Sequence, residues 1–172
     1  MKRGRTYLLA LASALLATSA PVSAEAPADT ISAADPGAIV LALTNAGFAP
    51  ELKKDLAGDP LIISRGRGAV LSVFFFGCDE TTHDKCQAIR LQVGYDRAKP
   101  WNAADAMQLS ARYPFLAVRL DEDGDPFVHW DLHLAEPIPL AAFIANVREF
   151  ERAVTFAADF VYAEEMMAPK GP

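Results

Sequence analysis

The sequence is poor in cysteine, in net positive charge and in long apolar runs. Its 172 residues include two cysteines, and 16 basic residues stand against 22 acidic ones, for a net charge of −6. An acidic surface repels phosphate backbones, so we expect no binding to nucleic acid. No apolar run reaches the roughly 18 residues that a membrane-spanning helix needs, so we expect no such helix.

Motifs that mark common catalytic sites are absent as well. The sequence contains no Gly-x-Ser-x-Gly, His-Glu-x-x-His or Walker pattern. The Cys-x-x-Cys spacing of disulfide exchange enzymes is also missing. Pairs of catalytic carboxylates have no such local motif, because their members can lie far apart in the sequence. The sequence therefore favours a protein that is not an enzyme and carries no cofactor or metal.

Residues 1–24 have the pattern of a secretory signal peptide. Three basic residues lie within the first five positions, the apolar run Tyr7–Ala17 follows, and Val22-Ser23-Ala24 is a small-residue cleavage site. An uncleaved membrane anchor is the alternative, but the apolar run is too short for one. We expect a periplasmic or secreted protein that does not contact the membrane after cleavage.

The two cysteines, Cys78 and Cys86, are closely spaced. In an oxidising compartment such a pair usually forms a disulfide. The closed ring has about nine residues, for which the chain-entropy estimate is roughly 2–3 kcal/mol of stabilisation. A zinc site that also uses His83 and Asp84 is an alternative, and free thiols are another.

The remaining chain is long enough for one domain. Residues 25–35 are rich in Ala, Pro and acid and predict a flexible leader, residues 36–163 form the domain, and residues 164–172 predict a flexible tail. Helices are expected over Pro36–Ala46, from the Asn102 cap to about Arg112, and from Pro139 onward. The last helix carries an apolar stripe, which predicts packing on a sheet, with a coiled-coil seam as the alternative.

Strand patterns occupy the segments between these helices. They are Glu51–Leu56, Leu61–Ser64, Val70–Phe76, Gln87–Tyr95, Leu116–Asp121 and Val128–Leu134. Val70–Phe76 is apolar on both faces, which is typical of a central strand that is covered on two sides. The order α-β-β-β-β-α-β-β-α with short connections predicts an α+β fold, with an antiparallel sheet of about six strands packed by two or three helices.

The motif Asp-x-x-Gly-Asp-Pro occurs twice, at 55–60 and at 121–126. Each copy lies between two strand patterns. Its glycine can take a positive φ, and its proline starts the next strand, so we expect the same hairpin turn in both places. The turn residues are Gly58, Asp59, Pro60, Gly124, Asp125 and Pro126. A calcium loop counted from Asp121 is the alternative, but it lacks glycine at its sixth position and glutamate at its twelfth.

His129, Asp131 and His133 alternate along one strand and therefore share a face. Two imidazoles and a carboxylate are plausible metal or ligand groups. The two histidines are about 13 Å apart along a straight strand, so one ion does not readily bind both. A solvated polar face is the simpler interpretation, and a ligand-binding face is the alternative.

Several motifs together resemble the YbjN-type domain family. They are Asn45-Ala46-Gly47-Phe48, Glu51-Leu52-x-x-Asp55, Gly58-Asp59-Pro60-Leu61-Ile62, Val73-Phe74-Phe75-Phe76-Gly77-Cys78, Cys86, Trp101-Asn102 and Asp121-x-x-Gly124-Asp125-Pro126. The resemblance covers about Pro36 to Tyr162 and is loose between Trp101 and Leu120. It implies a candidate regulator of bacterial sensory transduction, with a fold similar to type III secretion chaperones. Such a fold usually binds proteins and often dimerises, and the family brings no catalytic residues.

Two functional hypotheses follow from these observations. The first is an exported, non-enzymatic binding module for a protein or peptide partner, with a homodimer as one possible assembly. The second is a sensor of a small ligand or metal that uses the face of His129, Asp131 and His133.

Overall fold

The computed structural model describes residues 29–66 and 69–167. The predicted signal peptide, residues 1–24, and the end of the predicted tail, residues 168–172, therefore lie outside the described residues. Within the described part, no helix is long and apolar enough to cross a membrane.

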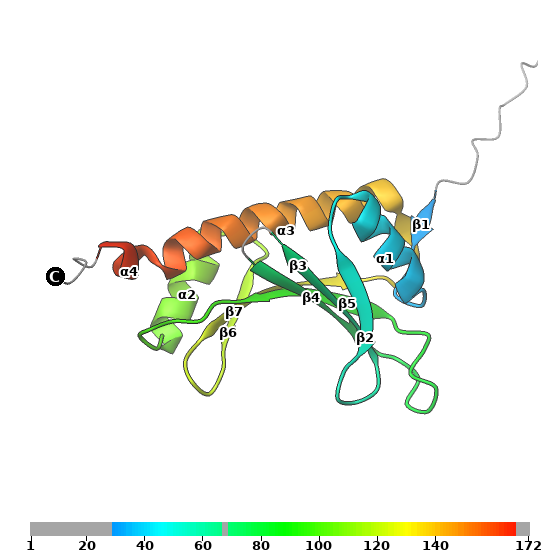
Figure 1. Cartoon of the computed structure of the whole chain (residues 1–172), viewed down its shortest axis with the longest axis horizontal. Coiled ribbons are helices and arrows are strands. Elements are labelled where there is room, and N and C mark those ends of the chain that lie inside the picture. The colour runs from blue at the N-terminus through cyan, green and yellow to red at the C-terminus, as the bar shows by residue number, and fades with distance from the viewer. Residues whose placement is uncertain (1–28, 67–68, 168–172) are drawn as a thin grey trace, which may run out of the picture.

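Six antiparallel strands form the main sheet, in the order β2-β3-β4-β5-β7-β6. Their bounds are β2 Pro50–Lys54, β3 Pro60–Gly66, β4 Ala69–Phe76, β5 Ala88–Gly94, β6 Ala117–Leu120 and β7 Pro126–His133. Figure 1 shows the strongly twisted sheet with the long helix α3 running above it. The strand and helix order confirms the α+β fold expected from the sequence.

The helices are α1 Pro36–Asn45, α2 Ala103–Arg112, α3 Leu140–Val161 and the short α4 Ala163–Met167. Asp35 caps α1 by accepting a hydrogen bond from the Ala38 amide at 3.0 Å, and Asn102 and Asp105 form a capping box at α2. α3 buries one stripe against the sheet, composed of Phe143, Val147, Phe150, Ala153, Ala157 and Val161. That stripe is part of the domain core, not a coiled-coil seam.

The segment predicted as a flexible leader contains ordered structure. Thr30–Ile31 forms β1, which pairs with β8, Ile138–Pro139, in a separate two-stranded sheet. Ile31 and Ala33 are buried, and the Asp29 carbonyl accepts a hydrogen bond from the Leu140 amide at 2.7 Å. A two-residue strand has no periodicity, so its pairing was not readable in the sequence. The predicted flexible tail likewise begins with α4.

The repeated motif forms two loops with the same internal hydrogen bonds. In the first turn, residues 55–59, the Asp55 carboxylate accepts from the amides of Ala57 and Asp59 at 2.9 and 3.0 Å. In the second turn, residues 121–125, the Asp121 carboxylate accepts from the equivalent amides at 3.1 and 2.9 Å. Both loops join antiparallel neighbours, β2 to β3 and β6 to β7, and the carboxylates satisfy the backbone of each turn.

Each turn also contacts a neighbouring loop. Asp59 lies 2.8 Å from the Nδ1 atom of His83, and Asp125 accepts from the Arg97 amide at 2.9 Å. His83 belongs to the disulfide loop, residues 77–87, which the Cys78–Cys86 bridge closes. The second aspartate of each motif therefore joins its hairpin to another part of the chain.

Gly124→Ala should lower the free energy of unfolding more than Gly47→Ala does. Both glycines have positive φ, +80° and +87°, so both variants carry the left-handed penalty of about 1 kcal/mol. A Cβ at Gly124 would lie only 2.7 Å from Pro100 Cβ, whereas nothing lies within 4 Å at Gly47. Overpacking should add about 1–3 kcal/mol at Gly124, measured by urea unfolding. Equal losses in the two variants would contradict the close approach.

Replacing both cysteines by serine should lower the free energy of unfolding by about 2–3 kcal/mol, because the unfolded chain regains the freedom that the bridge removes. Urea unfolding of this double variant measures the loss. Intact mass after alkylation without reductant is the control, and it should show no labelled thiol on the wild-type protein. Two labels, or a double variant as stable as the wild type, would show that the bridge does not hold the loop.

Candidate functional site

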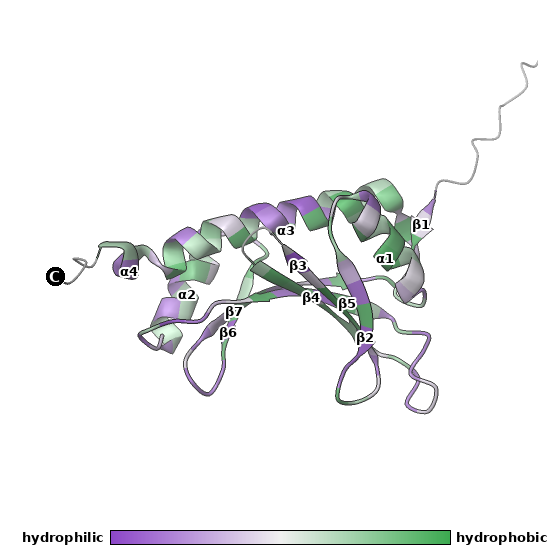
Figure 2. Cartoon of the chain, viewed as in Figure 1, coloured by the Kyte–Doolittle hydropathy of each residue, from purple (hydrophilic) through white to green (hydrophobic). Residues whose placement is uncertain are grey.

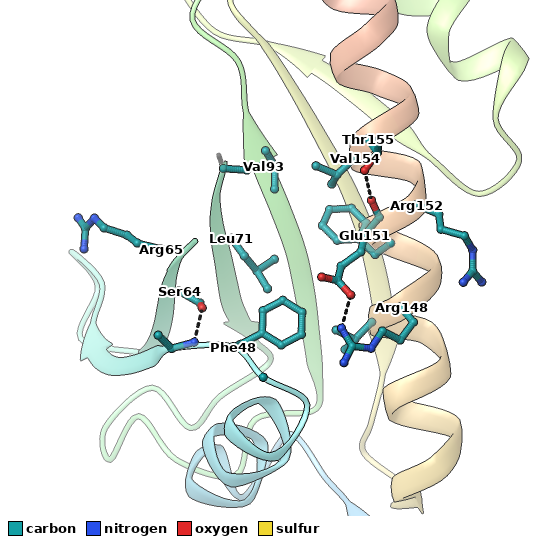
Figure 3. A pocket seen from close by; sticks show the side chains of 15 residues that line it. Phe48, Ser64, Arg65, Leu71, Val93, Arg148, Glu151, Arg152, Val154 and Thr155 are labelled. Atoms are coloured by element: carbon teal, nitrogen blue, oxygen red, sulfur yellow. Dashed lines mark hydrogen bonds and ion pairs between the residues drawn. The ribbon is translucent and has the colours of Figure 1, made fainter. Parts of the chain in front are cut away.

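A groove of about 470 Å³ lies between α3 and the strands β3 and β4, and we call it the α3 groove. Residues from five segments line it: Gly47, Phe48, Ala49, Ser64, Arg65, Ala69, Leu71, Val93, Val147, Arg148, Phe150, Glu151, Arg152, Val154 and Thr155. Its volume falls within the range of about 300–1,000 Å³ that is typical of ligand sites. Figure 3 shows Phe48, Leu71 and Val154 around the open space.

The apolar floor follows from the alternation of the strands and the period of α3. Leu71 in β4 and Val93 in β5 point toward the helices and are buried. Val147 and Phe150 supply the facing side of α3 and are also buried. Because α3 is one continuous helix that crosses the sheet, its apolar stripe packs on β5 and β7 and leaves space beside β3 and β4.

Phe48 forms one wall because of the way α1 ends. Gly47 takes φ +87°, and the Phe48 amide donates to the Leu43 carbonyl at 3.0 Å, so the chain reverses directly after the helix. The next residue, Ala49, donates from its amide to the Ser64 hydroxyl at 3.2 Å. These bonds hold the start of β2 beside β3 and fix Phe48 at the groove.

Arg148 connects α3 to the end of α1 across the mouth of the groove. Its guanidinium donates to the Ala46 carbonyl and to the Glu151 carboxylate, the latter at 2.6 Å. It also lies 5.5 Å from the centroid of the Phe48 ring. A cation is favourable at a helix C-terminus because the last carbonyls have no helical partner. Arg148 therefore fixes the distance between the two helices at this point.

The rim of the groove has an excess of positive charge in an acidic chain. Its charged lining residues are three arginines and one glutamate. Figure 3 shows Arg65 and Arg152 pointing away from the open space. Arg152 pairs with Glu149, which lies outside the groove. The groove can thus accept apolar side chains at its floor, while its arginines are paired or point away from the open space.

The residues predicted as a ligand face lie elsewhere. His129, Asp131 and His133 belong to β7, and their pairing register places them on the sheet face opposite the groove, beside Gln92, Arg90 and Ala88 of β5. Arg90 donates to both Asp131 oxygens, at 2.7 and 2.8 Å. Among the described residues, no group of three His, Cys, Asp or Glu side chains could hold a metal ion. Arg90 already binds the Asp131 carboxylate, which a metal site on this face would need as a ligand.

The pKa of His129, on that face, is shifted from its ordinary value. Burial lowers the pKa of His129 below its ordinary value of 6.5, and the charges of Arg90 and Arg119 lower it further, against the opposing effect of Asp131. Its Nδ1 atom is buried and has no hydrogen-bond partner in the described structure. The hydrogen bonds from Arg90 lower the pKa of Asp131. This arrangement favours a neutral imidazole next to a closed ion pair.

Sequence reasoning did not find the α3 groove. Its lining residues come from distant segments, and each of them individually reads as a core or helix-surface position. The Gly47-Phe48 dipeptide at the end of α1 was the signal that could have indicated a wall, since a residue after a C′ glycine often packs against its helix.

Two comparisons with known proteins bear on this geometry. The model of the YbjN family, described as "Putative bacterial sensory transduction regulator", matches residues 35–161. A search of curated proteins finds no match.

Replacing His129 by glutamine should reduce the loss of stability on acidification. Because the folded pKa of His129 lies below the unfolded value, the unfolded state takes up the proton first. The contribution of His129 to the free energy of unfolding is therefore fully present above about pH 6.5. It is lost as the pH falls toward the folded pKa. Urea unfolding at pH 7 and pH 5 should show a smaller difference in His129→Gln than in the wild type. Equal differences would show that His129 is not held neutral by the fold.

Proposed function

Because the chain belongs to the YbjN family, we propose that it is a regulatory module that acts by binding a protein partner and not by catalysis. The family description names a regulator, and the α3 groove provides a surface for such binding. We further propose that the module works outside the cytoplasm. The signal-peptide pattern of residues 1–24 and the Cys78–Cys86 disulfide support that location.

The observation that carries the proposal is the open apolar floor of the α3 groove. Leu71, Val93 and Phe150 line this floor with the small part of their surface that stays exposed, and the half-buried Val154 adds to it. Buried apolar anchors supply most of the affinity of protein interfaces, and a surrounding polar rim excludes water. The groove therefore fits one or two apolar side chains of a partner segment.

The face of His129, Asp131 and His133 does not offer a comparable site. Asp131 is fully engaged by Arg90, and His129 is partly buried beneath its neighbours. No observation in the described structure favours the metal or small-ligand sensor, so we do not propose it.

A photo-cross-linking amino acid in place of Thr155 should capture the partner. Thr155 is exposed on α3 and lines the groove, whereas Ala145 is exposed on the same helix outside the lining. Irradiation of cells that produce each variant, followed by denaturing purification, should give a covalent adduct from position 155 and none from position 145.

Thr155→Trp should fill the mouth of the groove and reduce recovery of that same partner by at least about tenfold, the equivalent of one lost apolar anchor. Ala145→Trp is the matched control and should leave recovery unchanged. Adducts of the same identity from both positions, or equal recovery with both tryptophan variants, would show that the α3 groove is not the binding site.

A further inference from the structure

Strand β4 is hydrophobic along most of its length, as its green colour in Figure 2 shows, and its alternation places apolar residues on both faces, of which the described residues cover only one. Leu71, Val73 and Phe75 point toward the helices and are buried. Val70 and Phe76 point to the opposite face and are 45% and 43% exposed. A central strand that is apolar on both faces is typical of a sheet covered on two sides. In the described residues, the second cover is missing.

The uncovered apolar positions form a continuous strip along β3 and β4. The register pairs Leu61 with Phe74 and Arg65 with Val70, and it places Ile63 opposite Ser72. One open antiparallel face normally carries polar side chains. Here five of the seven positions are apolar: Leu61, Ile63, Val70, Phe74 and Phe76. We call these five residues the open-face strip.

The two ends of the open-face strip differ in shape. At one end, Phe76 projects from the end of β4 next to the disulfide loop. At the other end is a hollow of about 590 Å³ lined by Arg65, Ala69, Val70, Ser72, Gln92, Gly94, Tyr95, Asp96, Asp125 and Phe127. Phe127 forms one wall of the hollow, and its ring packs directly against Gly94, where a Cβ would lie 2.5 Å from it.

Charged side chains border both ends. The disulfide loop beside Phe76 exposes Asp79, Glu80 and Asp84 against a single cation, Lys85. Arg65 is exposed at the hollow. Asp96 and Asp125 lie on the β5 side of that hollow, where Asp125 already accepts from the Arg97 amide. Three other cations of the face have internal partners: Lys53 pairs with Glu51 at 2.8 Å, Arg90 pairs with Asp131, and Arg119 lies 4.3 Å from the centroid of the Phe127 ring.

We propose that the open-face strip is covered by a second copy of this chain, related by a two-fold axis. An interface of this kind needs one patch that is complementary to itself. In this arrangement Phe76 of each copy enters the hollow of the other, and the acidic disulfide loop of each copy meets the partner's Arg65. The apolar strips cross between these two equivalent contacts. The α3 groove lies on the opposite side of the sheet and stays open.

The size of the face is sufficient for such a dimer. Six strands span about 24 Å and a strand of seven residues about 25 Å, so two whole faces, of which the open-face strip is the apolar part, bury at most roughly 1,200 Å² in total. That value lies at the lower limit of stable interfaces, so we expect a reversible dimer with a dissociation constant in the micromolar range.

Sedimentation equilibrium of the purified protein over a range of concentrations tests this proposal. The wild type should associate to a dimer, and Phe76→Ser should raise the dissociation constant by at least about 30-fold, as loss of a central aromatic anchor does. Leu52→Ser is the matched control, because Leu52 is also an exposed apolar strand residue (51%) but faces the helix side. It should leave the dissociation constant unchanged, and circular dichroism should show all three proteins folded.

A photo-cross-linking amino acid at position 76 gives a second, independent measurement. It should yield a covalent dimer whose link maps to a peptide that contains Val70 or Phe127. A wild type that stays monomeric up to about 1 mM, a dimer that Phe76→Ser does not weaken, or a link to residues 1–28 or to another protein would each overturn the proposal. None of these results affects binding at the α3 groove, which Thr155→Trp tests separately.

Discussion

The sheet has two large faces, and the described residues provide one layer of helices to cover them. Burying the apolar stripe of α3 against β5 and β7 stabilises the domain, but a helix about 10 Å wide cannot cover a sheet about 24 Å wide. α1 fills part of the remaining space beside β2, and Arg148 holds it next to α3. The α3 groove is the space that this packing leaves, and the open-face strip is the face that it does not reach.

These two surfaces lie on opposite sides of one sheet and share two lining residues, Arg65 and Ala69, at the end of the β3–β4 hairpin. The groove is narrow, apolar at its floor and basic at its rim, which suits a short segment of a partner protein. The open-face strip is broad, with Phe76 projecting at one end and a hollow at the other, which suits a second copy. A regulator that presents both surfaces would bring two partner segments into one assembly without a catalytic step. The loops that border the strip are held by the Asp59–His83 pair and by the Cys78–Cys86 bridge, which keep Phe76 in a fixed position.

The sequence predicted the elements whose apolar residues recur at a regular spacing. It missed the short elements that have no such repeat. The apolar stripe of α3, the alternation of β5 and β7 and the caps Asp35 and Asn102 gave boundaries within one or two residues. β1 and β8 are two residues each, and they form because Ile31 becomes buried beside α3, which only the assembled fold reveals. The α3 groove depends on how α1, α3 and the sheet pack together, which no local sequence pattern encodes. His129 and Asp131 were placed on one face as expected, but the long-range bond from Arg90 decides their chemistry, and no local pattern encodes it. The double-sided apolar pattern of Val70–Phe76 was readable, and its second cover is not in the described chain.

The solvent accessibility of methyl groups in solution tests the central claim most directly. A soluble paramagnetic agent broadens the NMR signals of methyl groups that it can approach. At a concentration where the protein is associated, we expect strong broadening of Val154, which faces the open groove, and protection of Ile63 to the level of the buried core residue Val73. Broadening of Ile63 together with protection of Val154 would show that the chain covers its groove and leaves its second sheet face bare, which contradicts the account.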